Sequence, residues 1–375
     1  MSRFRLRDIG IIACPGGAFF AQELVAQLHS IVAKKLRNTK PPKFDIETTF
    51  TRFANGEFKT TILEGVRGKD IYIVQDTANH YPLKINPEDD GPGYVLSVND
   101  HIFCLLTTVD AVLQAGAERV TVVLPSYPYA RQHKKTGREG LTAARFGQIL
   151  ENMGVARIIT LDIHSREIEN CFNRLRLENL HASYQILLTL AKIISLNEER
   201  LVFVSPDTGS VERNKFYALA LKKPLAVMYK ERDYSRITRD ANQTNITRVN
   251  LLGSVEGKIV FMGDDLLGSG GTLIAALKAL KEKGAEKIIC AVSLPLFTGN
   301  AIEIFDRAYA EGLFYRIIGT NAVYHSESLY SKEWYLSANV SRLFAKTIFR
   351  LCVNQPLSPL LDNRQIIAKL ISQKY

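Results

Sequence analysis

A glycine-rich turn preceded by two aspartates is the part of the sequence best suited to hold a charged ligand. In FMGDDLLGSGGTLIAALKAL (261–280), an apolar run leads to Asp264 and Asp265, and an amphipathic pattern follows the turn. The turn comprises Gly268, Ser269, Gly270, Gly271 and Thr272. Backbone N–H groups at a helix N-terminus bind phosphate, and the two hydroxyls add donors. We therefore expect a sugar phosphate here, with the aspartates on sugar hydroxyls or, through water, on Mg²⁺. The alternative is an ordinary strand-to-helix turn.

Cationic side chains suited to polyphosphate chemistry occur in two other stretches. Lys230 and Arg232 lie in YKERDYSR (229–236), and Arg131 begins RQHKKTGR (131–138). Arginine offers a fork for two phosphate oxygens, and lysine offers a compact point charge. The run from Arg131 repels itself when empty, so we expect a loop that closes on a polyphosphate. For Lys230 and Arg232 the alternative is solvated charge in a surface loop.

A histidine and an aspartate end two further apolar runs. His164 closes RIITLDIH (157–164), and Asp207 closes RLVFVSPD (200–207). Taken alone, His164 is often no more than a hydrogen-bonded structural residue at the end of a strand. Asp207 can equally be the N-cap of a helix, because a helical pattern follows it.

Short β-branched runs alternate with helical stretches along the chain. Six runs predict buried strands: KDIYIVQD (69–76), RVTVVLP (119–125), RIITLDIH (157–164), RLVFVSPD (200–207), GKIVFMGDD (257–265) and KIICAVSLP (287–295). Helical periodicity occurs between them, in LTAARFGQILENMG (141–154) and TLIAALKALKEKG (272–284). This alternation predicts an α/β fold with doubly wound, mainly parallel sheets.

Internal similarity indicates two domains of similar construction. GVRGKDIYIVQD (65–76) resembles GSVEGKIVFMGDD (253–265), which suggests corresponding strands in two halves. A second pattern, a helix that ends at glycine before a strand, occurs in AGAERVTVV (115–123), MGVARIITL (153–161) and KGAEKIICA (283–291). We expect a first domain over residues 1–180, a second over 181–335, and a C-terminal helix and tail over 336–375.

Composition restricts the classes of function. The chain has 375 residues and a formal net charge of +10. No apolar stretch approaches the roughly 18 residues of a membrane span, so we expect a cytoplasmic protein without a membrane partner. Basic residues are spread along the chain without a nucleic-acid-binding motif, which favours small polyanions over nucleic acid. The five cysteines form no CxxC pair, which suggests neither a disulfide framework nor a thiolate metal site.

One segment rich in proline, glycine and acidic residues, ANHYPLKINPEDDGPGY (78–94), predicts a surface excursion between a strand and a helix.

Seven motifs occur in an order that matches one known family. Besides DDLLGSGGT, they are FANGEF (53–58), YPYARQHKK (127–135), TLDIHSREIENCF (160–172), VSPDTGSVER (204–213), YKERDYSR (229–236) and LFTGNAIE (296–303). DDLLGSGGT resembles the phosphoribosyl-binding loop of phosphoribosyltransferase-fold proteins. Together the motifs resemble the ribose-phosphate pyrophosphokinase family, also called phosphoribosyl pyrophosphate (PRPP) synthetases.

This resemblance implies two phosphoribosyltransferase-like domains and a defined reaction. Such an enzyme transfers the β,γ-diphosphoryl group of MgATP to the anomeric hydroxyl of ribose 5-phosphate and releases AMP. The chemistry needs in-line positioning and cations against the charge on the β-phosphate. The resemblance also implies a homo-oligomer, in the family a hexamer built from dimers, because ATP binds across a subunit interface.

Roles follow for the positions that match the family motifs. The residues expected at ATP are Phe53, Asn55, Gly56, Glu57, Arg131 and Gln132. His164 and Asp207 match Mg²⁺-associated positions, and Lys230 and Arg232 match a catalytic cationic pair beside the reacting phosphates. Those expected at ribose 5-phosphate are Asp264, Asp265, Gly268, Ser269, Gly270, Gly271 and Thr272. For FANGEF the alternative is a simple turn.

Several positions depart from the family pattern. Gly268 stands where the phosphate loop usually carries a third aspartate, Ser210 where a second glycine is common, and His133 where an aspartate usually follows Arg–Gln. The excursion at 78–94 adds roughly sixteen residues. These departures keep open a non-catalytic regulatory or scaffold relative of the synthetase. A phosphoribosyltransferase that uses PRPP to modify a base would share the loop but would not explain the other motifs.

Overall fold

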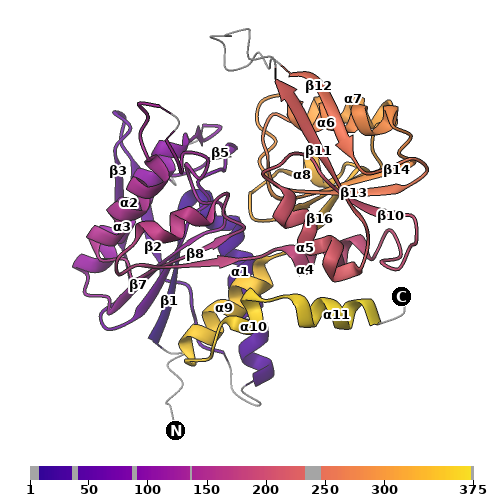
Figure 1. Cartoon of the computed structure of the whole chain (residues 1–375). Helices are drawn as coiled ribbons and strands as arrows, with labels where there is room; N and C mark the ends of the chain where they lie inside the picture. Colours follow the sequence, from indigo (N-terminus) through magenta and orange to yellow (C-terminus); the bar gives the residue numbers. More distant parts are fainter. Residues whose placement is uncertain (1–7, 36–40, 87–90, 136, 233–245, 373–375) are drawn as a thin grey trace. The chain divides into compact units, whose positions relative to one another are not determined.

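The structure, a computed structural model, describes residues 8–35, 41–86, 91–135, 137–232 and 246–372 (Figure 1). The side chains of 230–232 and 246–249 lie outside this description. Contacts divide the chain into two units. Unit 1 comprises the described residues up to Ala182, with Asn321–Ser326 and Asn339–Asp362. Unit 2 comprises those of Ser183–Thr320, with Glu327–Ala338 and the residues from Asn363 onward.

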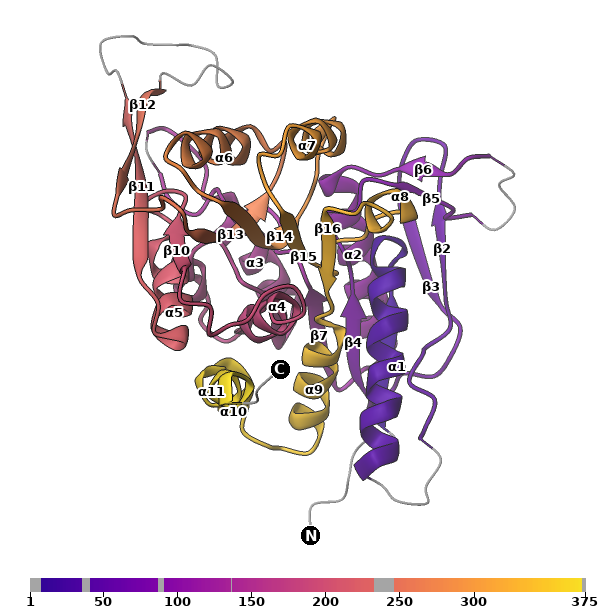
Figure 2. The same cartoon turned by 90° about the vertical axis from the view of Figure 1, so that its right-hand side faces the viewer.

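Unit 1 is built around a parallel sheet. The strand order is β1 (Ile9–Ala13), β4 (Asp70–Val74), β7 (Arg119–Leu124), β8 (Arg157–Leu161) and β9 (Arg176–Leu180). Its helices are α1 (Ala18–Lys35), α2 (Val98–Gln114), α3 (Thr142–Met153), α9 (Ser341–Cys352) and α10 (Ser358–Leu361). Strand, α2 and α3 side chains form one buried hydrophobic cluster. Helix α9 packs along α1 (Figure 2). The ring centroids of Phe20 and Phe344 lie 5.0 Å apart between these helices.

Shorter elements of unit 1 connect the strands and helices. They are the antiparallel hairpins β2 (Thr48–Arg52) with β3 (Phe58–Ile62) and β5 (Pro82–Leu83) with β6 (Tyr94–Val95), and the 3-10 helices η2 (Pro15–Gly17) and η3 (Arg166–Cys171). The β5–β6 hairpin lies in the predicted excursion, between β4 and α2 as expected. The excursion is partly buried, because Asn79 and Ile85 lie in the interior of the unit. Its residues 87–90 lie outside the described part of the chain.

Unit 2 contains a larger sheet of mainly parallel strands. The order is β12 (Ile246–Leu252), β11 (Leu225–Arg232), β10 (Leu201–Ser205), β13 (Ile259–Leu267), β14 (Lys287–Pro295), β15 (Arg316–Thr320) and β16 (Tyr335–Ala338). Its helices are α4 (Ser183–Leu190), α5 (Val211–Leu221), α6 (Gly271–Glu282), α7 (Ala301–Ala310), α8 (Glu327–Tyr330) and α11 (Arg364–Ser372). Figure 2 shows α6 and α7 on one face of this sheet, with α4 and α5 on the opposite face. The predicted α/β class with mainly parallel sheets is confirmed.

The internal similarity found in the sequence corresponds to a structural repeat. β4 and β13 are the second strands in two parallel series, β1-β4-β7-β8-β9 and β10-β13-β14-β15-β16. The turn before each strand is closed in the same way, because the N–H of Lys69 donates to the carbonyl of Val66 and that of Lys258 donates to Val255, each at 3.0 Å. Two similarly built units therefore account for the two sequence echoes.

The three predicted helix ends at glycine are also confirmed. Gly116, Gly154 and Gly284 have φ angles of 85°, 100° and 82°. In each case the glycine N–H donates to the carbonyl three residues earlier, and the following N–H donates to the carbonyl five residues before its own position. These two bonds form a Schellman motif, which satisfies the last carbonyls of the helix before the chain enters a strand.

Two expectations about local structure need correction. Residues 229–232 of the charged stretch belong to strand β11, which pairs antiparallel with β12, and so they are not in a loop. The described part of this segment, residues 336–372, contains the end of β16 and three helices, of which α9 and α10 belong to unit 1 and α11 belongs to unit 2. Helix α11 is held on α4 and α5 by its buried Ile367 and Leu370, a tertiary contact that its sequence pattern alone did not identify.

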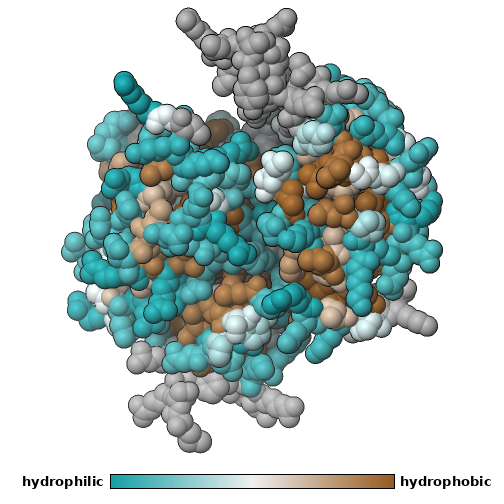
Figure 3. Space-filling model, in the orientation of Figure 1, coloured by the Kyte–Doolittle hydropathy of each residue, from teal (hydrophilic) through white to brown (hydrophobic). Residues whose placement is uncertain are grey.

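The face of the molecule seen in Figure 3 is mostly hydrophilic, with apolar residues exposed in several places. Among the described residues, no helix has both the length and the apolar character needed to cross a membrane.

Candidate functional site

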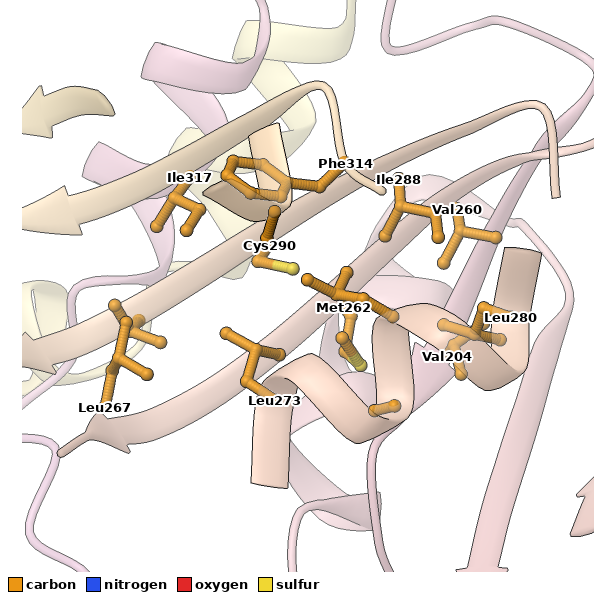
Figure 4. Close-up of a cluster of buried hydrophobic side chains, with 14 of the residues drawn as sticks. Val204, Val260, Met262, Leu267, Leu273, Leu280, Ile288, Cys290, Phe314 and Ile317 are labelled. Atoms are coloured by element: carbon orange, nitrogen blue, oxygen red, sulfur yellow. The ribbon is translucent and has the colours of Figure 1, made fainter. Parts of the chain in front are cut away.

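The glycine-rich turn lies where one strand of unit 2 continues beyond its neighbour. β10 pairs with β13 only as far as Met262, whereas β13 continues along β14 through Asp264 to Leu267. The two aspartates therefore extend past the carboxyl end of β10, which is where ligands of open α/β sheets bind. Buried Leu267 and Leu273 flank the turn, and Figure 4 shows both side chains in the hydrophobic cluster beneath it.

The N-terminus of α6 is open to an anion. Gly270 precedes the helix with φ of 84°, no side chain caps the first turn, and the first turn contains no acidic residue. Ser269 and Thr272 are exposed beside it. Because first-turn N–H groups have no partners within the helix, this end carries a partial positive charge that suits a phosphate. Glycine is required at position 270, since a Cβ there would lie 2.5 Å from the ring of Phe305.

Asp264, the first residue of the acidic pair, is half-buried. Its Oδ1 accepts hydrogen bonds from the Asp265 backbone N–H and from the Ser210 hydroxyl, both at 2.9 Å. Burial, followed by the charge of Asp265, raises the pKa of Asp264 to about 7, while the Ser210 hydrogen bond favours the ionised form. In its ionised form, the Asp264 carboxylate can accept hydrogen bonds from sugar hydroxyls.

Asp207 is joined to the same serine. The Ser210 N–H donates to Asp207 Oδ1 at 2.9 Å, and the Ser205 hydroxyl donates to the Asp207 carbonyl at 2.7 Å. Ser210, not Asp207, is the residue immediately before α5, and the Asp207 carboxylate accepts the N–H of Ser210 at the entry to that helix. The structure thus brings Asp207 and Asp264 together on Ser210.

Asn214 holds this arrangement in place and was missed by sequence reasoning. Its fully buried Nδ2 donates to the carbonyls of Ser210 and Gly263, at 2.9 and 2.8 Å, and its Oδ1 accepts from the Gly263 N–H at 2.8 Å. A signal was present, because Tyr217 and Ala218 follow Asn214 at helical spacing and face the core. A polar residue on that apolar stripe needs partners within the protein.

The FANGEF motif forms the loop of the β2–β3 hairpin in unit 1. The Phe53 N–H donates to the Glu57 carbonyl at 2.9 Å, the Gly56 N–H donates to the Phe53 carbonyl at 2.8 Å, and Asn55 Oδ1 accepts from the Glu57 N–H at 3.2 Å. The motif is therefore a turn, and it also presents the side chains of Phe53, Asn55 and Glu57 to solvent. A turn with exposed aromatic, amide and carboxylate groups is suited to a nucleotide base.

A second group of unit 1 residues gathers around His164. This exposed histidine follows β8, and its ring lies edge-on to that of His133, with centroids 5.3 Å apart. His133 comes directly after Arg131 and Gln132, both exposed, so the structure brings the ARQ segment next to His164. Asp162, two residues before His164, is buried, and its carboxylate accepts from the Ala182 N–H at 3.1 Å.

The remaining predicted residues are described only in part. Lys230 and Arg232 have their backbones in β11, opposite Val249 and Ile246 of β12, and their side chains lie outside the description. His164 belongs to unit 1 and Asp207 to unit 2. Within the described ranges, no three histidine, cysteine, aspartate or glutamate side chains are clustered as metal ligands.

Comparison with known proteins gives concordant results. The family model for the N-terminal domain of ribose phosphate pyrophosphokinase matches residues 19–154, and that for the phosphoribosyl transferase domain matches residues 173–329. Ribose-phosphate pyrophosphokinase of Mycoplasma pneumoniae is 33% identical over 300 residues, which are 80% of this chain and 82% of that protein. The enzyme named ribose-phosphate pyrophosphokinase A of Dictyostelium discoideum is 31% identical over 313 residues, 83% and 89% of the two chains.

A solved structure agrees with these relatives. The crystal structure of phosphoribosylpyrophosphate synthetase from Mycobacterium smegmatis superimposes with a TM-score of 0.72 at 28% identity, and covers 92% of this chain and 99% of that one. The expected pair of phosphoribosyltransferase-like domains is thereby confirmed. With both domains matched in order and relatives aligned over most of their length, the chain belongs to the ribose-phosphate pyrophosphokinase family.

Proposed function

We propose that this chain synthesises PRPP by transferring the diphosphoryl group of ATP to ribose 5-phosphate. One observation carries the proposal: the open N-terminus of α6 lies directly after an acidic pair that Ser210 links to Asp207. A sugar phosphate needs both features, because its phosphate binds helix N–H groups and its hydroxyls bind carboxylates. The names of the aligned relatives support the same activity.

The proposed reaction balances without a covalent enzyme intermediate. The anomeric hydroxyl oxygen of ribose 5-phosphate attacks the β-phosphorus of ATP, the bond from that phosphorus to the α,β-bridging oxygen breaks, and AMP leaves with this oxygen. The hydroxyl proton passes to water. Residues 268–272 hold the 5-phosphate, Asp264 and Asp265 orient the ribose, and Lys230, Arg232 and Arg131 supply cations near the transferred phosphates.

The chain's residues fit an Mg²⁺ that takes part of its coordination from substrate. Mg²⁺ prefers oxygen ligands, keeps several waters and is usually bound by one or two carboxylates plus phosphates. Asp207 offers one carboxylate, whereas an imidazole such as that of His164 is a poor direct ligand and would contact a bound water. When bound, Mg²⁺ would neutralise charge on the β- and γ-phosphates. Asp207 and His164 are proposed to hold it because they match the family's Mg²⁺-associated positions.

The FANGEF loop is proposed to contact adenine through Phe53, Asn55, Gly56 and Glu57, with Arg131 and Gln132 on the nucleotide. The family resemblance implies that such a loop completes the pocket of a neighbouring subunit, so we propose a homo-oligomer assembled from dimers. A cytoplasmic location is part of the same proposal, because ATP and sugar phosphates are available there. Light scattering of the purified chain measures the assembly, and a monomer that still turns over would contradict it.

A regulatory or scaffold role is the second candidate. The observation in its favour is Gly268, which leaves the phosphate loop without the third carboxylate usual in the family. Such a relative would bind an active synthetase or its substrates without turnover.

The deciding experiment measures AMP and PRPP formation from ribose 5-phosphate, MgATP and inorganic phosphate. We expect turnover by the parent chain, its loss in Lys230→Ala, and its retention in Lys278→Ala, which removes an exposed lysine of α6. Turnover that appears only in Gly268→Asp would show a site disabled by the missing carboxylate. If neither the parent nor Gly268→Asp turns over, and both bind ribose 5-phosphate or an active synthetase, the regulatory role replaces the proposal.

A further inference from the structure

The inserted segment before α2 is anchored in unit 1 at its base. We call the insertion hairpin the described residues 79–86 and 91–95, which contain β5 and β6. Asn79 is buried, its Nδ2 donates to the Gly16 carbonyl at 3.1 Å, and its Oδ1 accepts from the Tyr81 N–H at 3.0 Å. The Tyr81 hydroxyl lies 3.1 Å from Nδ1 of His325. Because its base is fixed by buried polar contacts, the insertion hairpin can hold the neighbouring strand β2 in position.

The far end of the insertion hairpin contacts the last residue of β2. Asn86 Oδ1 accepts from the Arg52 N–H at 2.9 Å, and Asn86 Nδ2 donates to the Arg52 carbonyl at 3.1 Å. One side-chain amide thus makes both hydrogen bonds that a neighbouring strand would make with this residue. The backbone of β2 is therefore held at its last residue, opposite Phe58, where β3 begins.

The Arg52 side chain is held by the same insertion. Its guanidinium carbon lies 4.7 Å from the centre of the Tyr94 ring, a cation–π distance. Arg52 Nε is buried and has no hydrogen-bond partner among the described residues, and the contact with the Tyr94 ring restrains this end of the side chain. The guanidinium also reaches the next loop, because a Cβ at Gly56 would lie 3.5 Å from Arg52 Nη2.

Arg52 directly precedes the loop Phe53–Glu57, to which the proposed function assigns adenine recognition. The loop side chains Phe53, Asn55 and Glu57 are exposed, and two backbone hydrogen bonds, Phe53 to Glu57 and Gly56 to Phe53, close it. A loop so exposed must be ordered when it binds a ligand, and this ordering opposes binding. Contacts that fix Arg52 hold the start of the loop before a ligand binds, and so reduce the entropic cost of ordering the loop on binding.

We propose that Asn86 and Tyr94 of the insertion hairpin are positioning residues that hold the Phe53–Glu57 loop ready for ATP. The inference rests on the proposed function only in naming ATP as the ligand. The insertion is thus an internal support for nucleotide affinity. It acts on ATP binding and leaves ribose 5-phosphate binding and the chemical step unchanged.

The test compares the full-length chain with Asn86→Ala, Tyr94→Leu and Tyr94→Phe. Hydrogen–deuterium exchange without nucleotide should rise in peptides spanning residues 50–60 for the first two variants, because their contacts to Arg52 are lost. Their KM for ATP should increase about five- to twentyfold, with kcat and the KM for ribose 5-phosphate unchanged. Tyr94→Phe retains the ring face and should behave like the parent. Lys84→Ala, an exposed change in the same hairpin, is the matched control.

The outcomes separate this inference from the proposed function. Unchanged loop exchange in Asn86→Ala and Tyr94→Leu overturns the positioning role, and so does faster exchange with an unchanged KM for ATP. If the parent forms no PRPP, the proposed function fails independently of the positioning role. The affinity for MgATP, measured by titration calorimetry, then replaces the KM for ATP. Weaker binding in the two variants supports the positioning role, and equal binding overturns it. If Asn86→Ala unfolds, as faster exchange across the strands of unit 1 would reveal, the Tyr94→Leu and Tyr94→Phe pair decides.

Discussion

The hydroxyl of Ser210 donates a hydrogen bond to Oδ1 of Asp264 at 2.9 Å. The backbone N–H of the same serine donates to Asp207, so one residue connects carboxylates from two different motifs. Ser210 stands where glycine is common in the family pattern, and glycine would retain only the backbone bond. The serine therefore adds a hydrogen bond that favours the ionised form of the half-buried Asp264.

Replacing Ser210 by glycine should move the pH dependence of ribose 5-phosphate use. Burial raises the pKa of Asp264 to about 7, and loss of the Ser210 donor raises it further because the carboxylate is less well stabilised. If the ionised form binds ribose, the acidic limb of kcat/KM for ribose 5-phosphate shifts to higher pH, by about one pH unit or less. Ser210→Ala should give the same shift without added backbone freedom. An acidic limb that stays in place in both variants would refute this role.

Gly270→Ala should destabilise unit 2, whereas Gly271→Ala should not. Alanine at φ of 84° is strained, and its Cβ would lie 2.5 Å from the Phe305 ring, so we expect a loss of about 2–4 kcal/mol in the free energy of unfolding. A Cβ at Gly271 meets no atom within 4 Å among the described residues. Thermal unfolding of both variants checks the contrast. Equal melting temperatures would show that the turn relaxes without strain.

Asn214→Ala should weaken the link between β13 and α5. The substitution leaves the N–H and carbonyl of Gly263 without the amide that pairs with both, and each buried orphan group costs about 1–3 kcal/mol. We expect urea unfolding to report a loss of about 3 kcal/mol, together with a higher KM for ribose 5-phosphate. Lys215→Ala changes an exposed neighbour and should leave both values near those of the parent. A stable Asn214→Ala protein with an unchanged KM would contradict the structural account.

Asp76→Asn should flatten the pH dependence of stability in unit 1. Burial raises the pKa of Asp76 to about 7, although its carboxylate accepts from the N–H groups of Tyr324 and Ala78, both at 2.9 Å. The folded state binds the proton more tightly than the unfolded chain, so the stabilisation is complete below about pH 4 and is lost as pH rises to about 7, by about 4 kcal/mol.

The measurement for Asp76 is urea unfolding near pH 5 and near pH 8. The parent should be less stable at the higher pH. Asp76→Asn, which has no carboxyl proton and loses one backbone hydrogen bond, should start lower and change less between the two pH values. Asp110→Asn replaces an exposed aspartate of α2 and should retain the parent's pH dependence. A parent whose stability rises across this window would show that other groups dominate.

Local patterns in the sequence were sufficient to predict the strands, the helix ends and the glycine-rich turn after Asp265. The β-branched runs became parallel strands because their side chains are buried on both sheet faces, and Gly116, Gly154 and Gly284 ended helices because glycine tolerates a positive φ. The turn after Asp265 was identified in the same way, from glycine spacing before an amphipathic helix. Each of these features depends on residues within one or two turns of chain.

Tertiary structure decided which polar groups meet. Ser210 contacts Asp264 across 54 residues, Asn214 contacts Gly263 across 49, and Arg52 meets Asn86 across 34. Local spacing carries no information on such pairs, because hydrogen bonding depends on distance and angle in space and only the packing of strands and helices sets those. The sequence by itself thus determined the kinds of element, the family motifs and the chemistry that they suggest. The fold determined how the carboxylates are linked and which residues hold the loops in position.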